Sequence, residues 1–475
     1  MHRFFGTYGF ATWATAQRAQ VGSVVFGWEH LIPLWPWTIV PYWSIDLLYG
    51  LSLLLCATKR ELDTHGRRLL TAQAIAVTCF LLFPLRFSVD RPAQDGVFGW
   101  MFDVLMGFDK PFNQAPSLHI TLLVVLWVCY AAHSRGIWKL LVHGWFALIG
   151  LSVLTTWQHH FIDLPTGVLA GWLCVWLWPD HRRAPTLKAT FTTDAARRRL
   201  AWRYLAGAGV FALLACRGGA ALWLAWPALS LGLVALNYAW LGPEGFQKRP
   251  DGTLSLAARW LFAPYLVAAR INAAWWTRRH HHADAVVDGV WLGPLRAWKP
   301  SQAPGIHGWV GVSSNGMSFN DMGSNGMGFK DMCSNGRSLN GMSSNDRKLH
   351  DISLIDMTAE IGVDPAGCAY ATFPVLDLTV PNVSTCLAAA DAIEQMRQRG
   401  PVLVACALGY SRSATAVAAW LLCSGRAASV DDAVALLQRA RPQVVLTARH
   451  RAVLSAVHHA VIDTPRLLPE TPHAA

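Results

Sequence analysis

The chain has 475 residues, 53% of them hydrophobic, and a formal net charge of +11. This length is too great for one ordinary hydrophobic core and predicts two or more domains. The basic residues lie at the ends of apolar runs and no nucleic-acid-binding motif accompanies them, so we expect no nucleic-acid partner. The ten cysteines contain no Cys-x2-Cys pair, so we expect neither a metal site nor a disulfide framework, and no cofactor motif is present.

Residues 1–241 hold nearly all the long apolar runs and predict an all-α, multi-spanning membrane bundle, since a span needs about 20 apolar residues. Residues 4–26 are a weaker candidate because Gln17 and Arg18 interrupt them, and the first residues show no cleavable signal. We divide this half into a membrane domain over residues 1–180 and two further spans within residues 181–241. The predicted spans are Trp37–Ala57, Leu69–Leu85, Leu118–Ala132, Ile137–Thr156, Phe161–Trp178, Ala201–Cys216 and Ala220–Leu241.

The charge of the connecting loops predicts the orientation of the bundle. One set of loops holds thirteen basic residues and the alternate set holds four, and the rule that positive loops stay inside places the richer set in the cytoplasm. We expect an integral protein, of a bacterial inner membrane, whose chain returns to the cytoplasm before Gly242. Leu254–Trp276 is apolar but contains Arg259 and Arg270, which predicts an amphipathic helix in the membrane interface.

Two of the apolar runs begin with ionisable side chains, which are costly at membrane depth and usually functional. They are His119 in one run and His159 with Asp163 in the other, and the topology places both at the outer, periplasmic face. His159 and Asp163 share a helix face, so the carboxylate can orient the imidazole. One histidine can then attack a phosphorus atom while the other protonates the leaving alkoxide. The basic residues of the preceding loop are candidates for binding the phosphate: Arg86, Arg91 and Lys110.

Three motifs of this half are Arg91-Pro92, Pro116-Ser117-Leu118-His119 and His159-x3-Asp163. Together they resemble the type 2 phosphatidic acid phosphatase superfamily, and most of all its inositol phosphorylceramide synthase-like branch. The resemblance covers residues 1–180. It implies that His159 is the nucleophile, Asp163 its partner and His119 the acid. Two positions depart from the phosphatase pattern, because Pro84 stands where a basic residue is expected and Val153 where an arginine is expected. Hydrolysis and phosphotransfer therefore both stay open.

Residues 242–284 are expected to form a juxtamembrane linker, and residues 285–462 a soluble α/β domain with a central sheet flanked by helices. Strands are predicted at residues 290–293 and 353–358. Between them, within residues 301–350, the chain repeats a ten-residue Ser-Asn-Gly-Met-rich unit that is too poor in apolar bulk to form a core. Metal binding through Met and Asn is one interpretation of this repeat, and a flexible insertion is the favoured one. Residues 463–475 are expected to be a disordered tail.

The run Val402–Cys406 predicts a buried strand that ends at a cysteine, and an alanine-rich helix follows from Ala414. A strand, a tight loop and a helix N-terminus make an anion cradle that also favours a thiolate. In this cradle Cys406 is the nucleophile, Arg412 binds two phosphate oxygens, and Ser413 donates to the sulfur as it leaves. The backbone groups of Gly409 and Ser411 are expected to contribute to phosphate binding.

This Cys-x5-Arg loop, set between a strand and a helix, resembles that of the protein tyrosine phosphatase superfamily, and the compact domain its dual-specificity branch. Asp377, 29 residues before Cys406, matches the general acid of that branch. Asp391 is a rival, although it is typical of a helix surface. Alanine at position 405 departs from the family, which usually has histidine there, and this change implies a slower enzyme.

The favoured function is a bifunctional phosphatase of the membrane. Its cytosolic domain would hydrolyse phosphate monoesters of proteins or lipid headgroups through Cys406, and its outer site would act on lipid phosphates. The main alternative is a non-catalytic phosphate-binding module on a membrane scaffold, which Ala405 and the repeat favour. A transporter is a third interpretation, but the charged residues gather at one face rather than at the midplane. The sequence leaves the oligomeric state open.

Overall fold

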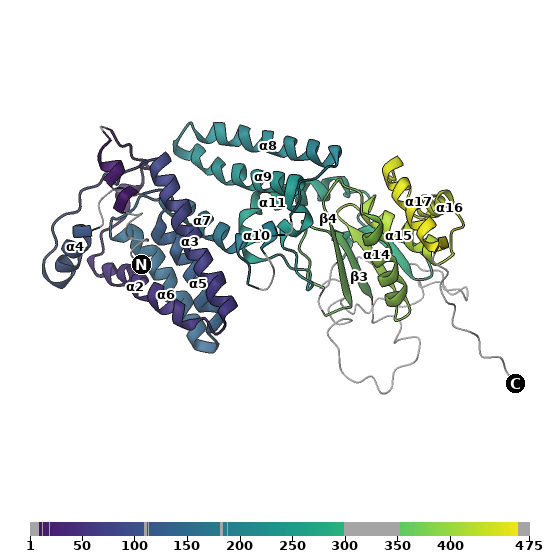
Figure 1. Ribbon diagram of the computed structural model, residues 1–475, viewed down its shortest axis with the longest axis horizontal. Coiled ribbons are helices and arrows are strands. Elements are labelled where there is room, and N and C mark those ends of the chain that lie inside the picture. Colours follow the sequence, from purple (N-terminus) through teal and green to yellow (C-terminus); the bar gives the residue numbers. More distant parts are fainter. Residues whose placement is uncertain are drawn as a thin grey trace. The chain divides into compact units, whose positions relative to one another are not determined.

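The computed structural model describes residues 9–11, 13–18, 20–108, 112, 114–180, 184–187, 189–298, 352–365 and 367–463 (Figure 1). The expected repeat insertion, Lys110 and residues 464–475 lie outside the described residues. The chain divides into two compact units, which we describe separately. Unit 1 contains residues 1–190, 202–235 and 256–264, and unit 2 contains residues 191–201, 236–255 and 265–475.

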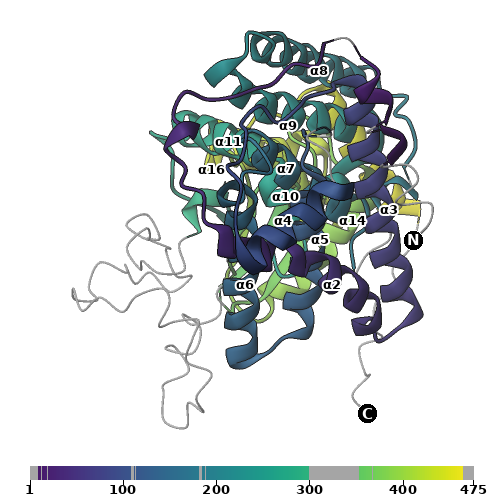
Figure 2. The same cartoon turned by 90° about the vertical axis from the view of Figure 1, so that its left-hand side faces the viewer.

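Unit 1 is helical, as predicted. Its helices α2, α3, α5 and α6 lie side by side, which Figure 2 shows face on. A predicted loop contains one unexpected helix, α4. The helices are α2 (Ile39–Leu55), α3 (Lys59–Leu82), α4 (Gly96–Phe108), α5 (Leu118–His133), α6 (Gly136–Thr155), α7 (Asp163–Leu177), α9 (Ala225–Leu236) and α10 (Leu256–Leu261), while α8 (Ala195–Ala215) is shared with unit 2.

The close approach of α5 and α7 positions the polar groups at their N-terminal ends. Gly167 and Gly171 of α7 face α5, and a Cβ atom at Gly171 would lie 2.6 Å from Val124 Cβ. At Gly167 an added Cβ would lie 2.8 Å from the carbonyl oxygen of Ser117. Small residues four apart let two helix backbones pack closely. The starts of α5 and α7 are therefore held together, with His119 on one and Asp163 on the other.

Three helical stretches are long and apolar enough to cross a membrane: Pro36–Leu55, Gly136–Thr155 and Gly219–Phe246. They overlap three of the seven predicted spans, so the full multi-spanning bundle stays a prediction. The sequence leaves open whether residues 4–26 span the membrane or lie in its interface, and their described part has left the helix by residue 20, which favours the second. One expectation needs correction. The predicted helix Leu254–Trp276 is divided into α10 and α11 (Ala263–Trp276), because Pro264 lacks the N–H that a continuous helix needs.

The predicted α/β domain forms the body of unit 2. Its sheet has the strand order β1-β2-β5-β3-β4, in which β1 is antiparallel to β2 and the remaining pairs are parallel. Strands β2, β3 and β5 are buried throughout, as expected for parallel strands covered on both faces. The strands are β1 (Asp284–Val287), β2 (Val290–Pro294), β3 (Ser353–Thr358), β4 (Tyr370–Val375) and β5 (Val402–Cys406).

Four helices complete this domain, and α15 is the central one. It packs against α14, α16 and α17 and buries eleven of its twelve residues, because its many alanines allow close contact with the strands. The strand β5 leads into α15 through a short loop, and this connection places the loop at the carboxyl end of the parallel strands. The helices are α14 (Val383–Arg397), α15 (Arg412–Cys423), α16 (Val430–Ala440) and α17 (Ala448–Asp463).

The segment expected as a linker, residues 242–284, is instead divided between the units, and most of it belongs to unit 2. Lys248 shows why, since its side chain and that of Asp356 on β3 are fully buried and form an ion pair. The Lys248 ammonium also donates to the backbone oxygen of Thr358 at 2.9 Å. A charge buried among such partners fixes the segment to the sheet, because an unpaired buried charge is costly.

Replacement of Lys248 by methionine is expected to destabilise unit 2 by about 3–5 kcal/mol, because Asp356 would be left as an unpaired buried charge. Thermal unfolding of the full-length protein, followed by residual hydrolysis of an aryl phosphate, measures the effect. Arg249→Met is the matched control, since the neighbouring Arg249 is exposed. Equal melting temperatures for the two variants would contradict this role of Lys248.

Candidate active site

The loop between β5 and α15 surrounds the sulfur of Cys406 with hydrogen-bond donors. The backbone N–H of Gly409 donates to Sγ at 3.2 Å, and the hydroxyl of Ser413 donates to it at 3.2 Å. Cys406 and Ser413 are both buried, and Ser411 caps α15 at its N-terminus. Donors that converge on a sulfur at a helix N-terminus stabilise its thiolate form. The structure thus brings together four of the residues predicted for this site.

Gly409 is required by the shape of this loop. Its φ is +74°, in the left-handed region that favours glycine. A Cβ atom at this position would lie 2.4 Å from the backbone carbon of Gly293 on β2. The loop and the edge of the sheet are therefore in direct backbone contact, and this contact keeps the Gly409 N–H directed at the sulfur.

Arg412, the last residue of the motif, is held by two acidic side chains. Its guanidinium donates to both carboxylate oxygens of Glu360, at 3.0 Å and 2.9 Å. It also donates to Asp377 Oδ1 at 2.9 Å and to the backbone oxygen of Val375 at 2.8 Å. Because the planar fork is fixed by a bidentate partner behind it, its orientation in the loop is set before any phosphate binds.

Asp377 lies next to the loop, where the sequence predicted an acid. Its backbone oxygen accepts a hydrogen bond of 2.9 Å from the buried hydroxyl of Tyr238, and its side chain is 35% exposed. Burial, helped by the Glu360 carboxylate and opposed by Arg412, raises the pKa of the Asp377 carboxyl above its usual value. A carboxyl that stays protonated to higher pH is suited to donate a proton. The rival Asp391 lies exposed on α14.

Two residues that support the site were not assigned a role from the sequence. Glu360 follows β3 in an ordinary Thr-Ala-Glu run, and no local signal marks it as the partner of Arg412. Arg441 is buried at the end of α16 and donates to the backbone oxygens of His282 and His280 at 3.0 Å and 3.1 Å. It also contacts the active-site loop, at 3.4 Å from the backbone oxygen of Leu408. The three consecutive histidines at positions 280–282 therefore contribute backbone oxygens to this contact.

Comparison with known proteins bears on this half of the chain. Residues 352–459 match the family model of the dual-specificity phosphatase catalytic domain. The chain contains a phosphatase domain of the dual-specificity type. The match begins at β3 and ends within α17, so it includes Cys406, Arg412 and Asp377. A comparison with curated proteins finds no match.

Three solved structures are each similar to part of the chain. Tk-PTP in its active form is 28% identical, over 23% of this chain and 78% of that one, with a TM-score of 0.21. PTPMT1 in complex with PI(5)P is 22% identical, over 24% and 80% of the two chains, with a TM-score of 0.22. A leucine-rich repeat and phosphatase domain protein from Entamoeba histolytica is 11% identical, over 38% and 94%, with a TM-score of 0.25.

In unit 1 the structure brings together His159, Asp163 and the start of α5. His159 Nδ1 lies 3.1 Å from Asp163 Oδ2, and its Nε2 lies 3.3 Å from the hydroxyl of Ser117. His119, two residues further along α5, stacks on Tyr42 with ring centroids 4.1 Å apart. The carboxylate can fix the proton of His159 on Nδ1, which leaves Nε2 as the nitrogen able to attack.

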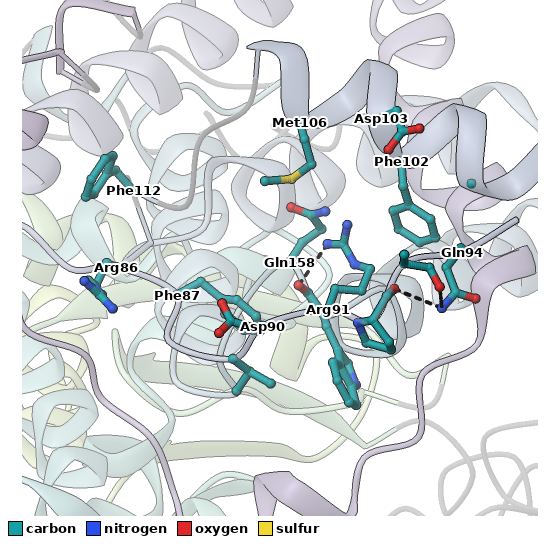
Figure 3. Close-up of a pocket in the computed structure, with 15 residues that line it drawn as sticks. Arg86, Phe87, Asp90, Arg91, Gln94, Phe102, Asp103, Met106, Phe112 and Gln158 are labelled. Carbon is teal, nitrogen blue, oxygen red and sulfur yellow. Dashed lines mark hydrogen bonds between the residues drawn. The ribbon is translucent and has the colours of Figure 1, made fainter.

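The two predicted arginines line a neighbouring cavity of about 400 Å³, shown in Figure 3. Arg91 donates to the backbone oxygens of Thr156 and Trp157, at 2.9 Å and 3.1 Å, so it also holds the turn that leads to His159. Arg86 lines the cavity beside Phe112, while the third predicted residue, Lys110, lies outside the described residues. Asp90, Gln94, Asp103 and Gln158 add to the polar lining.

Proposed function

We propose that this chain is a membrane-anchored phosphatase that hydrolyses phosphate monoesters through a covalent intermediate on Cys406. The observation that carries the proposal is the sulfur of Cys406, which accepts from Gly409 and Ser413 at 3.2 Å each. In the first step Sγ attacks phosphorus while the leaving oxygen takes a proton from Asp377. In the second step water attacks the phosphothiol, Asp377 takes a proton from it, and Sγ leaves as a thiolate that Ser413 stabilises.

Phosphate binding in this mechanism uses Arg412 and the loop backbone. The Glu360 carboxylate holds the guanidinium in place from behind. Once Asp377 releases Nη2, that nitrogen and Nε offer two N–H groups to two phosphate oxygens as charge develops. Loop N–H groups, with those of Gly409 and Ser411 among them, supply the other donors. Alanine at position 405 is buried at the end of β5 and leaves these contacts intact, which favours an active enzyme over a phosphate-binding module.

The helix α11 favours a substrate at the membrane surface. One face of it exposes Val267, Ile271 and Trp275, and these residues are four apart, so they form one apolar stripe. Arg278 stacks on Trp275 at 4.0 Å, and the Trp276 backbone oxygen lies 3.5 Å from the hydroxyl of Tyr410 in the active-site loop. An apolar stripe flanked by a cation is typical of a helix in the membrane interface. We therefore propose phosphorylated headgroups or phosphoproteins at the bilayer surface as substrates.

A second function is proposed for unit 1, where His159 would take a phosphoryl group from a lipid phosphate. The contact of His159 with Asp163 and the nearby His119 favour it, and Arg86 and Arg91 would bind the phosphate. We place this site at the outer face of a bacterial inner membrane and the phosphatase domain in the cytoplasm, from the charge of the loops.

Phosphate release from phosphatidic acid and from an aryl phosphate, measured on one purified sample, tests both proposals. His159→Ala is expected to lower lipid phosphate hydrolysis by about 10³-fold and to leave aryl phosphate hydrolysis unchanged. His143→Ala is the control, since the ring of His143 lies on α6 and accepts a hydrogen bond from the Trp127 side chain at 2.8 Å. Lipid phosphate turnover that depends on Cys406 and not on His159 would refute the second site.

A further inference from the structure

A second histidine in unit 1, His160, belongs to a relay that the proposed function does not use. Its Nδ1 lies 2.9 Å from Glu29 Oε2, and its Nε2 lies 3.1 Å from the hydroxyl oxygen of Ser88. The three residues are far apart in the sequence and come from three loops outside the helices of the bundle. A hydroxyl, an imidazole and a carboxyl joined in this order form the arrangement that activates a serine.

The hydrogen bonds decide which nitrogen of His160 carries the proton. Nε2 lies 3.2 Å from the backbone nitrogen of Ser88, whose N–H can only donate, so Nε2 accepts. The proton is therefore on Nδ1 and is donated to Glu29. The single lone pair of Nε2 is then shared between the Ser88 N–H and the Ser88 hydroxyl, and it can take the hydroxyl proton as a general base does.

Glu29 is anchored as a fixed acceptor. Its Oε1 accepts from the backbone N–H of Phe26 at 2.8 Å, and its Oε2 accepts from that of Phe161 at 3.2 Å. The side chains of His160 and Glu29 are 3% and 7% exposed, whereas Ser88 is exposed. A buried base behind an accessible hydroxyl is the arrangement that a nucleophile needs, because the base stays oriented while the hydroxyl reaches substrate.

The cavity beside this relay is of a kind that holds an acyl chain. It has a volume of about 350 Å³, and both Glu29 and His160 line it, together with the two neighbours of Ser88, Phe87 and Val89. The rest of its wall is largely apolar. It consists of Val25, Phe26, Ile32, Leu154 and Trp157, with Gly27, His30 and His159.

We propose that Ser88, His160 and Glu29 form an acyl-transfer site that takes carboxylic esters with an apolar acyl group. Ser88 Oγ bonds to the carbonyl carbon as its proton passes to His160 Nε2. The tetrahedral intermediate then expels the alcohol, which leaves with that proton, and an acyl-Ser88 ester remains. Water attacks this ester, gives a proton to His160, and the carboxylic acid is released as Ser88 recovers its proton. Glu29 acts through His160 as a positioning residue.

Labelling with a fluorophosphonate probe and hydrolysis of p-nitrophenyl butyrate test the site on full-length protein. Both are measured in a Cys406→Ser background, because a thiolate also attacks activated esters. We expect the probe adduct on Ser88 by peptide mass spectrometry, and about 10³-fold slower ester hydrolysis in Ser88→Ala. That variant keeps the backbone bond to His160, so folding is preserved. Ser134→Ala is the matched control, since the Ser134 hydroxyl donates to the backbone oxygen of Tyr130 at 2.8 Å and Ser134 does not line the cavity.

Glu29→Gln separates positioning from a structural role. Since glutamine cannot hold the Nδ1 proton as a carboxylate does, the ester rate is expected to fall by about 10²–10⁴-fold, with a shifted pH profile and unchanged melting. An adduct absent from Ser88, or ester hydrolysis that persists in Ser88→Ala, would overturn the proposal. Neither result would affect the thiolate site, whose aryl phosphate activity is measured separately on the wild-type background.

Discussion

Cys406→Ser is expected to lower hydrolysis of p-nitrophenyl phosphate by about 10³-fold or more, because a serine hydroxyl in this cradle is not ionised at neutral pH. The bonds from Gly409 and Ser413 would remain, since an oxygen also accepts them, so the fold should be preserved. The rate of p-nitrophenol release at saturating substrate measures the effect. A loss of this size would assign the chemistry to the sulfur rather than to phosphate binding alone.

Cys216→Ser is the control for this substitution. Cys216 is exposed in unit 1, directly after α8, and should leave aryl phosphate hydrolysis unchanged. Aryl phosphate turnover that survives Cys406→Ser would point to a different nucleophile. If the wild-type protein binds phosphate but hydrolyses neither the aryl phosphate nor phosphatidic acid, the alternative of a non-catalytic phosphate-binding module is favoured.

Asp377→Asn is expected to lower kcat for an aryl phosphate by about 10²–10⁴-fold, since the leaving oxygen would lose its proton donor. The pH profile gives a second readout. Burial raises the pKa of Asp377, so the protonated acid persists to higher pH and activity falls as pH rises through that value. In Asp377→Asn this basic limb of the kcat profile should disappear, because no proton is left to titrate.

Asp391→Asn is the matched control, since Asp391 was the other candidate acid and lies exposed on α14. The Asp391→Asn variant should keep both the wild-type kcat for the aryl phosphate and the fall of kcat at high pH. The opposite pattern, with the limb lost in Asp391→Asn and retained in Asp377→Asn, would show that the acid was assigned to the wrong residue. A substrate with a good leaving group should also reduce the deficit of Asp377→Asn, because such a group needs less protonation.

The active-site loop could be predicted from the sequence because its determinants are local. Residues 402–423 contain, in order, a buried strand, a cysteine, a glycine and an alanine-rich helix. Each of these favours the tight loop between β5 and α15. Glu360 could not be predicted, since it reaches Arg412 from 52 residues away through the packing of β3 beside β5. The burial of Glu360 beside the charged Arg412 is a tertiary contact, and the pattern of hydrophobic residues along the sequence does not predict it.

The residues before the phosphatase domain were harder to assign for a related reason. Apolar composition predicts a membrane span over Ala220–Leu241, and the helical stretch Gly219–Phe246 is long and apolar enough for one. Composition does not show that Tyr238, near the end of this stretch, donates to the backbone oxygen of Asp377. Lys248 lies in the segment expected as a linker, and its pairing with Asp356 depends on how that segment packs against β3. Composition reports how much of a segment is apolar, and it does not say which surface the segment packs against.

In unit 1 the local pairs were predictable and the distant ones were not. His159 and Asp163 are four residues apart, and helical spacing brings them together. His160 and Glu29 are separated by 131 residues, so their contact depends on how the loops fold over the bundle. His159 and His160 are adjacent in sequence yet contact different partners, and this separation would let one chain segment contribute to both proposed sites.

The most direct test of the central claim is to trap the phosphoenzyme. Full-length protein is mixed with a ³²P-labelled aryl phosphate, quenched within milliseconds in denaturing detergent at alkaline pH, and digested at that pH for peptide mapping. The account predicts label on the peptide that contains Cys406, as a phosphothiol that survives alkali and is lost in mild acid, and its absence from Cys406→Ser. Turnover without any label on Cys406, or label that survives in Cys406→Ser, would contradict it.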